Sequence, residues 1–486
     1  MNLTLRLDPN RVRHWHVRLA ERLARRPDTH VGIVWSAGVT PLPSAVGLLM
    51  TLERLIYGLP NDDMTRATTR ADFARFVAVT DPDLVLDFTG AAPDAARTWR
   101  ITFDGAADEA AALAALTAYR TPVVAITDAA TGAVIVSGHP GTETAGVFTL
   151  ALRDVLARTT TLIIAALDGA AAKLEAAPQA PRALTTGAVA TFAARSLARA
   201  AAGRLYHLCY NAPHWRVGWR FVEGPDVVDL RAHPPSGWRD LPDDRSRFYA
   251  DPFPVEHQGR TFLFVEDFVH AAGYGVISAV EFDANGPVGT PHPVLDTGSH
   301  LSYPFVFEYD GTMWMVPESG ADGTVDLYRA EAFPARWVKE TTLLSGIVAG
   351  DATLFEHDGR WWMFATVRDQ GGAYSDSLHI WSASTFRGPW QPNRRNPVLV
   401  DIATARPAGR VVRRGDKLIR PFQDCDAGYG AALGLAEITR LDDEHFEQRV
   451  LTVLKPGPLW PGRRLHTLNR AGRLECIDGS ATARRF

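Results

Sequence analysis

Residues 351–366 read DATLFEHDGRWWMFAT, and two earlier stretches of the chain repeat this pattern. The earlier copies are DPFPVEHQGRTFLFVE at 251–266 and YPFVFEYDGTMWMVPE at 303–318. In each copy, apolar residues alternate on both sides of a short turn that contains glycine, which is typical of a β-hairpin. The repetition indicates that this part of the chain is built from several copies of one β unit.

Two weaker copies continue the series toward the C-terminus, RPAGRVVRRGDKLIRP at 406–421 and LHTLNRAGRLECIDG at 465–479. Aligned on the turn glycine, the copies lie about 50 residues apart, at Gly259, Gly311, Gly359, Gly415 and Gly472. A second alternating pair of segments follows most copies, for example GTVDLYRAEAF and DSLHIWSASTF. Units of four strands at this period predict the blades of a β-propeller.

The fifth copy is followed by too few residues for a second hairpin. HWRVGWRFVE at 214–223 also alternates apolar residues, precedes the first copy and has no other partner. Because an open sheet edge invites unwanted pairing, we expect this early segment to complete the last blade and close the ring. The prediction is an all-β five-bladed propeller over residues 213–486, with a β-sandwich as the alternative.

Residues 1–168 are rich in alanine, and strand patterns alternate there with helical patterns. Strands are expected at 30–36, 83–88 and 97–103, and helices at 44–59, 108–119 and 146–167. This alternation predicts an α/β domain with a parallel, helix-covered sheet. Residues 169–212 are expected to form a linker, with the Ala/Pro stretch at 169–184, and then an arginine-containing helix. Its arginines are typical of a solvated face, and a membrane-surface helix is the alternative.

The chain has 486 residues, of which 46% are hydrophobic and 22% charged, the composition of a soluble multidomain protein. Its net charge of −4 gives no electrostatic reason to expect nucleic acid or an anionic membrane as a partner. The N-terminus carries charges where a signal peptide needs an apolar run, and no membrane span is expected. Three cysteines without metal-ligand spacing fit a reducing compartment. We therefore expect a cytoplasmic protein.

The residue that opens each copy differs from blade to blade, and this difference indicates a functional site. The first strand of every propeller blade lines the central channel, so equivalent positions converge at one mouth. The residues at or near these positions and at the ends of the second strands are Asp251, Glu266, Tyr303, Glu318, Asp351, Arg406, Arg410, Gln423, Asp424 and His466. Carboxylates brought together shift each other's pKa, so that one can act as an acid while another stays ionised.

We predict Asp251, Asp351 and Glu318 as catalytic residues, and the remaining polar residues of this set as substrate-binding. The alternative is a structural role, because an aspartate before proline often caps a turn and a repeated aspartate can tie a blade to its neighbour. No cofactor is predicted. Paired carboxylates can coordinate calcium, but no run of oxygen ligands in the sequence requires a metal.

The segments FYADPFPVEHQGRTFLFVEDF, HLSYPFVFEYDGTMWMVPES and GDATLFEHDGRWWMFAT resemble the N-terminal propeller domain of plant glucosamine inositolphosphorylceramide transferases and their bacterial relatives. That domain is similar to the five-bladed furanosidase superfamily of arabinanases, xylosidases and fructosidases. The resemblance implies that Asp251 occupies the position of the base and Asp351 that of an aspartate that tunes pKa.

In the arabinanase-like enzymes the acid glutamate opens the next blade, where this chain has ARPAGR. Glu318 or Glu266 would therefore have to serve as the acid, because glycoside hydrolysis needs two suitably placed carboxylates. In the plant transferase the glycosyl transfer chemistry is assigned to a separate C-terminal domain, so the resemblance does not carry the activity with it.

The first half shows a second resemblance, in DLVLDFTG, RTWRITFDG and TPVVAITDAATGAVIVSGHPG, to methionyl-tRNA and sugar N-formyltransferases. In that family the third strand ends in an Asn-x-His pair, and a distal aspartate completes a catalytic trio. This chain has Thr102, Phe103 and Asp104 at the strand end, a displaced DAATG turn at 128–132, and His139 in a loop. The resemblance implies a degenerate domain that is structural or binds a ligand without formylating it.

Three classes of function follow. The first is a glycosidase- or glycosyltransferase-like enzyme that acts on a glycan or glycoconjugate in the propeller mouth. The second is a non-catalytic glycan-recognition protein, in which the same polar residues bind without reacting. The third is a formyltransferase-like enzyme whose catalytic trio is not visible in the sequence. The expected partner is a glycan or a sugar-containing small molecule.

Overall fold

The computed structural model describes residues 1–37, 41–60, 63–92, 97–169, 179–180, 182–369 and 371–485. These residues divide into two compact units. The first contains Met1–Ala202 and the short segments Asp369–Ala373 and Leu399–Asp401, and the second contains the rest of the chain from Gly203 onward. Most of the linker predicted at 169–184 lies outside the described residues.

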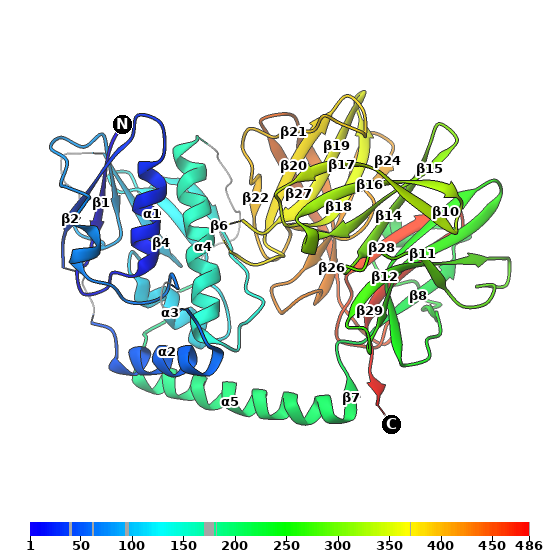
Figure 1. The fold of residues 1–486 in the computed structure, drawn as a ribbon, viewed down its shortest axis with the longest axis horizontal. Helices are drawn as coiled ribbons and strands as arrows, with labels where there is room; N and C mark the ends of the chain where they lie inside the picture. Colours follow the sequence, from blue (N-terminus) through cyan, green and yellow to red (C-terminus); the bar gives the residue numbers. More distant parts are fainter. Residues whose placement is uncertain are drawn as a thin grey trace. The chain divides into compact units, whose positions relative to one another are not determined.

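In its described part, the first unit is built around one sheet of order β2-β1-β3-β4-β5-β6 (Figure 1). The strands that pair in parallel are β1 (Asn2–Leu7), β2 (His30–Trp35), β3 (Leu84–Asp87) and β4 (Thr98–Phe103). β5 (Val124–Asp128) and β6 (Val134–Gly138) continue the sheet in antiparallel pairing. The predicted α/β class is confirmed, with a mixed sheet in place of a wholly parallel one.

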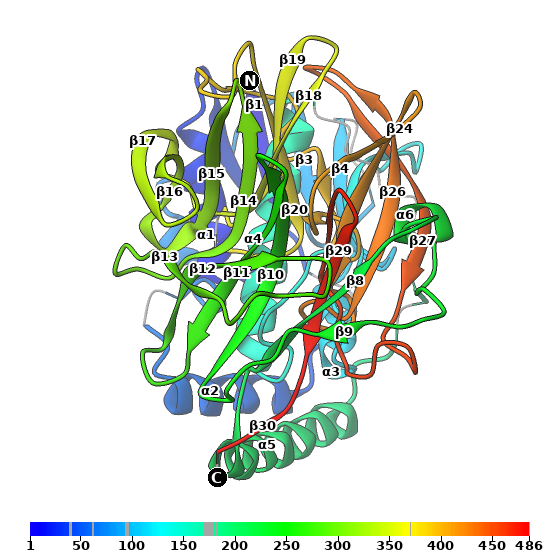
Figure 2. The ribbon, with the colours of Figure 1, turned by 90° about the vertical axis from the view of Figure 1, so that its right-hand side faces the viewer.

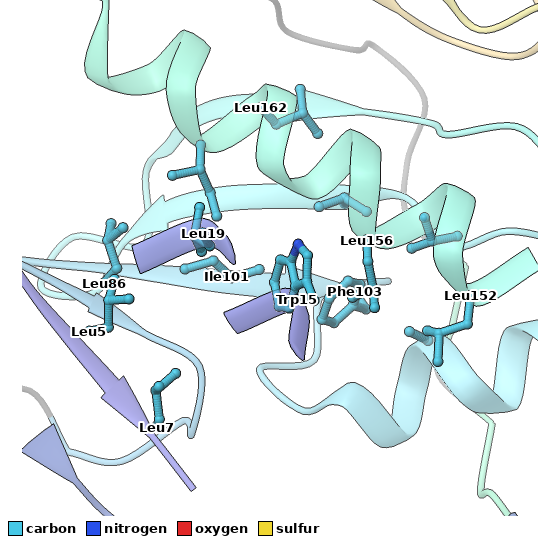
Figure 3. Packing of buried hydrophobic residues seen from close by; sticks show 14 of the residues in the cluster. Leu5, Leu7, Trp15, Leu19, Leu86, Ile101, Phe103, Leu152, Leu156 and Leu162 are labelled. Atoms are coloured by element: carbon cyan, nitrogen blue, oxygen red, sulfur yellow. The ribbon is translucent and has the colours of Figure 1, made fainter. Parts of the chain in front are cut away.

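The described helices of the first unit that precede residue 169 are α1 (His14–Ala24), α2 (Ser44–Tyr57), α3 (Glu109–Thr117) and α4 (Phe148–Leu167), with a short 3₁₀ turn, η1 (Arg70–Phe73). Figure 3 shows the core that α1 and α4 form with the sheet, made of Trp15, Leu19, Leu152, Leu156 and Leu162 of the helices and Leu5, Leu86, Ile101 and Phe103 of the strands. Helical residues four positions apart share one face, which explains why Trp15 and Leu19 both reach this core.

α5 (Thr186–Cys209) is the arginine-containing helix that the sequence predicts. Arg195, Arg199 and Arg204 are exposed on it, whereas Val189 and Phe192 are buried. Among the described residues, no helix combines the length and the hydropathy that crossing a membrane requires.

The second unit is a propeller, and its first four blades each follow the chain in order. The strands of the first two blades are β10 (Arg247–His257), β11 (Arg260–Val269), β12 (Tyr274–Phe282), β13 (His292–Leu295), β14 (Ser302–Tyr309), β15 (Thr312–Ser319), β16 (Thr324–Ala332) and β17 (Arg336–Ser345). The strands of the next two are β18 (Ala349–His357), β19 (Arg360–Val367), β20 (Ser377–Ala383), β21 (Gln391–Pro392), β23 (Arg406–Pro407), β24 (Val412–Arg414), β25 (Lys417–Asp424), β26 (Ala432–Leu441) and β27 (Phe446–Leu454). Antiparallel blades confirm the propeller over the sandwich alternative.

The fifth blade is completed by strands from the beginning of the unit. Its order is β28 (Thr467–Ala471), β29 (Leu474–Ser480), β8 (Trp215–Phe221) and β9 (Arg239–Asp240). β8 pairs antiparallel with β29 from Trp215 opposite Ser480 to Phe221 opposite Leu474. Figure 2 shows the green β8 beside the red β29, although the two are far apart in the sequence. The predicted ring closure is therefore confirmed.

The packing of β8 in the last blade can be tested at Gly218. A Cβ atom on Gly218 would lie 2.3 Å from the ring of Trp460, whose side chain is 1% exposed and cannot move aside into solvent. We expect Gly218→Ala to lower the free energy of unfolding by about 1–3 kcal/mol, the usual cost of overpacking a core. Urea unfolding measures this change. Gly224→Ala is the control, since a Cβ there has nothing within 4 Å; equal losses in both variants would contradict this packing.

Candidate functional site

The position that differs between the copies is a β-bulge in the first strand of the first three blades. The pairing register of β10, β14 and β18 with the following strand shifts at this point. The bulged residues Asp251, Tyr303 and Asp351 have φ angles of 49°, 43° and 55°. Left-handed backbone is uncommon for residues other than glycine, and residues held this way cluster at functional sites. The three residues are therefore held in place by their surroundings.

The backbone N–H of each bulged residue donates to a carboxylate of the preceding blade. Asp251 N donates to Asp478 Oδ2 at 2.8 Å, and Tyr303 N donates to Asp251 Oδ2 at 3.2 Å. Asp351 N donates to Glu318 Oε2 at 2.9 Å. These contacts tie adjacent blades together around the central channel, a region that we call the hub. The hub carboxylates therefore also have a structural role, which is the alternative considered for them from the sequence.

Asp251 is surrounded by hydrogen-bonding and charged groups of the last blade. Its Oδ1 accepts a hydrogen bond from Thr467 Oγ1 at 2.8 Å, and His466 Nε2 lies 3.9 Å from the same oxygen. The side chain is buried, and burial raises its pKa to about 6. His466 opposes this rise, while the nearby carboxylates of Asp478 and Asp351 add to it.

His466 is enclosed between aromatic rings and carboxylates. Its ring stacks on Trp215 with centroids 4.1 Å apart, and Tyr429 meets it edge-on at 5.3 Å. Its Nδ1 lies 2.6 Å from Asp478 Oδ1. Burial alone lowers the pKa of the imidazole, but Asp478 and Asp251 together raise it above the ordinary value. The imidazole thus holds its proton more tightly than it would in water.

Asp351 faces the cationic side of the channel. Its Oδ2 accepts from Arg406 Nε at 2.5 Å and from Gln423 Nε2 at 2.9 Å. Arg406 also lies 3.7 Å from Glu318 Oε2 and 4.8 Å from the centroid of the Tyr429 ring. Burial raises the pKa of Asp351 to about 7. Arg406 lowers this pKa and Glu318 raises it, so the two effects partly cancel. The buried guanidinium of Arg406 therefore lies within ion-pair distance of both Asp351 and Glu318.

Glu266 is the carboxyl group of this cluster whose properties best match a general acid. It lies in β11 and is 8% exposed. Burial raises its pKa well above the usual range, and the charges of Asp251 and Glu318 add to this effect. His300 Nε2 lies 3.8 Å from Glu266 Oε1 on the more exposed side. A raised pKa favours the protonated form of the carboxyl group, which is the form that a general acid needs.

Tyr303, predicted to bind substrate, directs its side chain away from these carboxylates. Its hydroxyl lies 2.8 Å from Thr353 Oγ1 and accepts a hydrogen bond from Gly409 N at 2.7 Å. The whole residue is 0% exposed. Its backbone N–H donates to Asp251 in the cluster, and its ring packs edge-on against Phe253.

Arg410 and Asp424 also lie apart from the cluster. The Arg410 guanidinium lies 5.1 Å from the Phe253 ring centroid and donates to the Val306 carbonyl. Burial lowers its pKa to about 10. Asp424 follows Gln423 in β25, so alternation along the strand directs it to the opposite face, where its Oδ1 accepts from the Asp426 N–H. The structure thus brings together the remaining predicted residues, namely Asp251, Glu266, Glu318, Asp351, Arg406, Gln423 and His466.

Four residues of this cluster were not predicted from the sequence, namely Asp478, Thr467, Trp215 and Tyr429. A signal for Asp478 exists, because it follows its turn glycine by nearly the same interval as Glu266 and Glu318 follow theirs. The first two copies end in a glutamate at this position, and the last copy ends in IDG. Trp215 carries no comparable signal, since its contact with His466 depends on ring closure.

Asp251, His466 and Asp478 also form a possible metal site. Each offers a ligand atom, and these atoms lie within 4.8 Å of one another. Two carboxylates and an imidazole are a donor set that divalent transition metals accept. His466 and Asp478 are already in contact, so a metal would have to replace the contact between Nδ1 and Oδ1.

In the first unit, the strand end that resembles the formyltransferase site is held by structural contacts. Asp104 Oδ1 accepts from Val123 N at 3.0 Å, and Arg120 lies 2.7 Å from its Oδ2. His139 Nε2 lies 3.3 Å from Thr121 Oγ1. The prediction that this domain no longer transfers formyl groups stays a prediction.

The raised pKa of Asp251 predicts a pH dependence of stability. A folded-state pKa of about 6, against 3.8 for the free side chain, means that the folded protein keeps a proton which the unfolded chain has lost. This contribution to stability is present at low pH and is lost as the pH rises through about 6, by on the order of 1–3 kcal/mol. We expect Asp251→Asn, which cannot ionise, to lose this part of the pH dependence in urea unfolding between about pH 4 and 7. Identical pH profiles for both proteins would contradict the burial of Asp251.

The buried ion pair predicts a large effect of Arg406→Gln. Removing the guanidinium leaves Asp351 and Glu318 close together without a cation, so we expect a loss of about 3–5 kcal/mol in the free energy of unfolding at pH 8. The loss is expected to shrink at pH 5, because Asp351, whose pKa is about 7, then takes up a proton. Arg260→Gln is the matched control, because Arg260 pairs with Glu281 on the surface and such pairs contribute at most about 1 kcal/mol. A comparable loss in the two variants would refute the buried pair.

Residues 241–475 match the family model described as glucosamine inositolphosphorylceramide transferase 1, N-terminal. Glucosamine inositolphosphorylceramide transferase 1 of Oryza sativa subsp. japonica is 32% identical over 233 residues, which cover 46% of this chain and 31% of the relative. The protein of the same name from Arabidopsis thaliana is 33% identical over 207 residues, covering 42% of this chain and 27% of the relative. The matched region thus spans less than a third of the length of these curated relatives.

Among solved structures, the catalytic domain of Coprinopsis cinerea GH62 alpha-L-arabinofuranosidase is 13% identical and covers 56% of this chain and 98% of its own, with a TM-score of 0.37. The family resemblance noted in the sequence is confirmed by the family model and by the curated relatives. The propeller of this chain is similar to the N-terminal domain of the glucosamine inositolphosphorylceramide transferase family.

Proposed function

We propose that the hub of the propeller binds and chemically transforms a glycan or glycoconjugate. The observation that carries this proposal is the cluster of Asp251, Glu266, Glu318 and Asp351 around Arg406, in which carboxyl groups of different pKa lie close together. Such a group of perturbed titratable residues is the usual mark of an active site. The name of the curated relatives, which describes a glucosamine transferase, supports a sugar as the ligand class.

The proposed chemistry is glycosyl transfer or hydrolysis by an acid and a base. Glu266 donates its proton to the oxygen of the departing group as the bond to the sugar carbon breaks. Asp251, largely ionised near neutral pH, takes the proton from the attacking hydroxyl of water or of an acceptor. Glu266 takes the role of acid in preference to Glu318, because the pKa of Glu266 is raised, whereas the Glu318 carboxylate already accepts the Asp351 N–H and lies 3.7 Å from Arg406.

Non-catalytic glycan recognition is the second candidate, and Arg406 is the observation that favours it. Arg406 opens the first strand of the fourth blade, the position of the acid glutamate in the arabinanase-like enzymes. It pairs with Asp351 and lies near Glu318, so the cation neutralises carboxylates that a hydrolase would use. In this case the cluster orients sugar hydroxyls by hydrogen bonds and breaks no bond.

The two candidates are separated by Asp251→Asn and Glu266→Gln. Asparagine can accept the Tyr303 N–H and donate to Thr467 Oγ1, so Asp251→Asn preserves the contacts of the hub. If the protein is an enzyme, we expect each variant to lose about 10²–10⁴-fold in turnover of glycosides and nucleotide sugars while binding is largely kept. If it is a recognition protein, wild type shows no turnover and the variants bind glycans about tenfold more weakly.

Binding is measured by calorimetry and turnover by product analysis. Asp424→Asn is the matched control, because its carboxylate lies on the opposite face of β25 from Gln423. Wild-type binding and turnover in both Asp251→Asn and Glu266→Gln would show that the hub is not the site.

A further inference from the structure

A cavity of about 1080 Å³ lies at the side of the last blade. Its walls are the start of β8, the end of β29, the segment before β28 and the loop between β9 and β10. This volume is at the upper end of the range for small-molecule sites. The cavity is therefore large enough for a ligand of several rings or for the head group of a larger molecule.

The lining of this cavity carries an excess of positive charge. Its arginines are Arg216, Arg245, Arg463 and Arg464, against the two aspartates Asp240 and Asp243. Asp240 lies 3.5 Å from Arg216 Nη1, and Asp243 lies 3.3 Å from His214 Nε2. Within the described chain, the guanidinium groups of Arg245 and Arg463 make no ion pair, and both residues are exposed. Two cations thus face the cavity without a counter-charge.

The backbone holds Arg245 in an uncommon conformation at the edge of the cavity. Its φ is 64°, in the left-handed region that arginine seldom adopts. Arg245 N donates to Asp243 Oδ1 at 2.6 Å, and Asn211 Nδ2 donates to the Arg245 carbonyl at 3.1 Å. These bonds fix the starting point of the side chain, which reduces the conformational freedom that its guanidinium would lose on binding a ligand.

Arg216 adds a donor that has no acceptor. Its Nε is buried and lacks a hydrogen-bond partner among the described residues, while its other nitrogens contact Asp240 and the Pro461 carbonyl. Burial lowers the pKa of this guanidinium, and Asp240 compensates only in part. The guanidinium also lies 4.1 Å from the centroid of the Trp460 ring, so its contacts fix it as a positive charge in the cavity wall.

We propose that this cavity is a binding site for a phosphate-bearing ligand. Guanidinium groups bind phosphate oxygens through paired, charge-assisted hydrogen bonds, and several arginines around one space suit a group with two negative charges. The hydroxyls of Ser480 and Thr482 line the same cavity and can donate to further phosphate oxygens. The proposal rests on this lining alone and holds whether or not the hub acts on a sugar.

The cavity and the hub share one wall. Trp215 lines the cavity and stacks on His466, and Arg464, also in the lining, donates to the Tyr429 carbonyl. A phosphate bound here would therefore lie next to the residues that enclose His466.

The test uses the full chain and isothermal titration at low ionic strength with inorganic pyrophosphate and with glucose 1-phosphate. We expect saturable binding of at least one of them, weakened by added salt. Arg245→Gln and Arg463→Gln are each expected to weaken binding about tenfold, and the double variant to remove it. Arg463→Lys should retain part of the affinity, since lysine keeps the charge and loses the paired geometry. Arg449→Gln is the matched control and should bind as wild type, because Arg449 on β27 pairs with Glu437 on β26 and neither residue lines the cavity.

A parallel arm with vesicles of phosphatidylcholine, with and without phosphatidylglycerol, identifies the source of the phosphate. Capture by the anionic vesicles alone, lost in the double variant, assigns the site to a lipid head group, whereas binding of glucose 1-phosphate assigns it to a soluble sugar phosphate. As an independent readout, pyrophosphate should protect Arg245 and Arg463 from phenylglyoxal, as seen by mass spectrometry. Failure of every phosphate probe to bind, or unchanged binding in the double variant, would overturn the proposal.

Discussion

The left-handed bulges at the start of the first strands are the constraint on which the propeller hub depends. Each bulge directs a backbone N–H toward the channel, where bulk water cannot accept its hydrogen bond. A carboxylate of the preceding blade accepts this N–H in each case. Asp478 accepts from Asp251, Asp251 from Tyr303, and Glu318 from Asp351. A left-handed residue costs about 1–2 kcal/mol, and a hydrogen bond to a charged group contributes about 1.5–3 kcal/mol, so the contacts can offset the strain.

This arrangement explains why structure and chemistry fall on the same residues. Asp251, which accepts one of these N–H groups, is buried, and so is Asp351, whose carboxylate accepts from Arg406 and Gln423 of the next blade. Burial raises the pKa of both groups. The hub then balances charge in two places, with His466 between Asp251 and Asp478, and Arg406 beside Asp351. Groups that hold blades together are therefore poised to titrate near neutral pH, as proton transfer to a sugar substrate would require.

The sequence predicts the propeller well because each blade is a local pattern. Alternation around a turn glycine marks the hairpins, and the unpaired segment at 214–223 marks the closing strand. The prediction is weaker where an element depends on distant contacts. β1 and α1 were not expected, although NLTLRL alternates apolar residues, and the antiparallel pairing of β5 to β4 depends on tertiary packing.

For the site, residue type and position predict which groups converge, but side-chain direction depends on the bulge. Asp251 and Asp351 meet the cluster as expected. At the same position, the ring of Tyr303 packs against Phe253, and its hydroxyl bonds to Thr353 and to the Gly409 N–H. Asp478 was missed because it stands six residues after its turn glycine, whereas Glu266 and Glu318 stand seven residues after theirs.

The most direct test of this account is carbon-13 NMR of the side-chain carboxyl groups in protein labelled at aspartate, with assignment by Asp251→Asn and Asp351→Asn. The account predicts that the resonances of Asp251 and Asp351 titrate with midpoints of about 6 and about 7. Midpoints near 4 for both residues, as in carboxylates exposed to water, would contradict a hub in which these groups are gathered and buried.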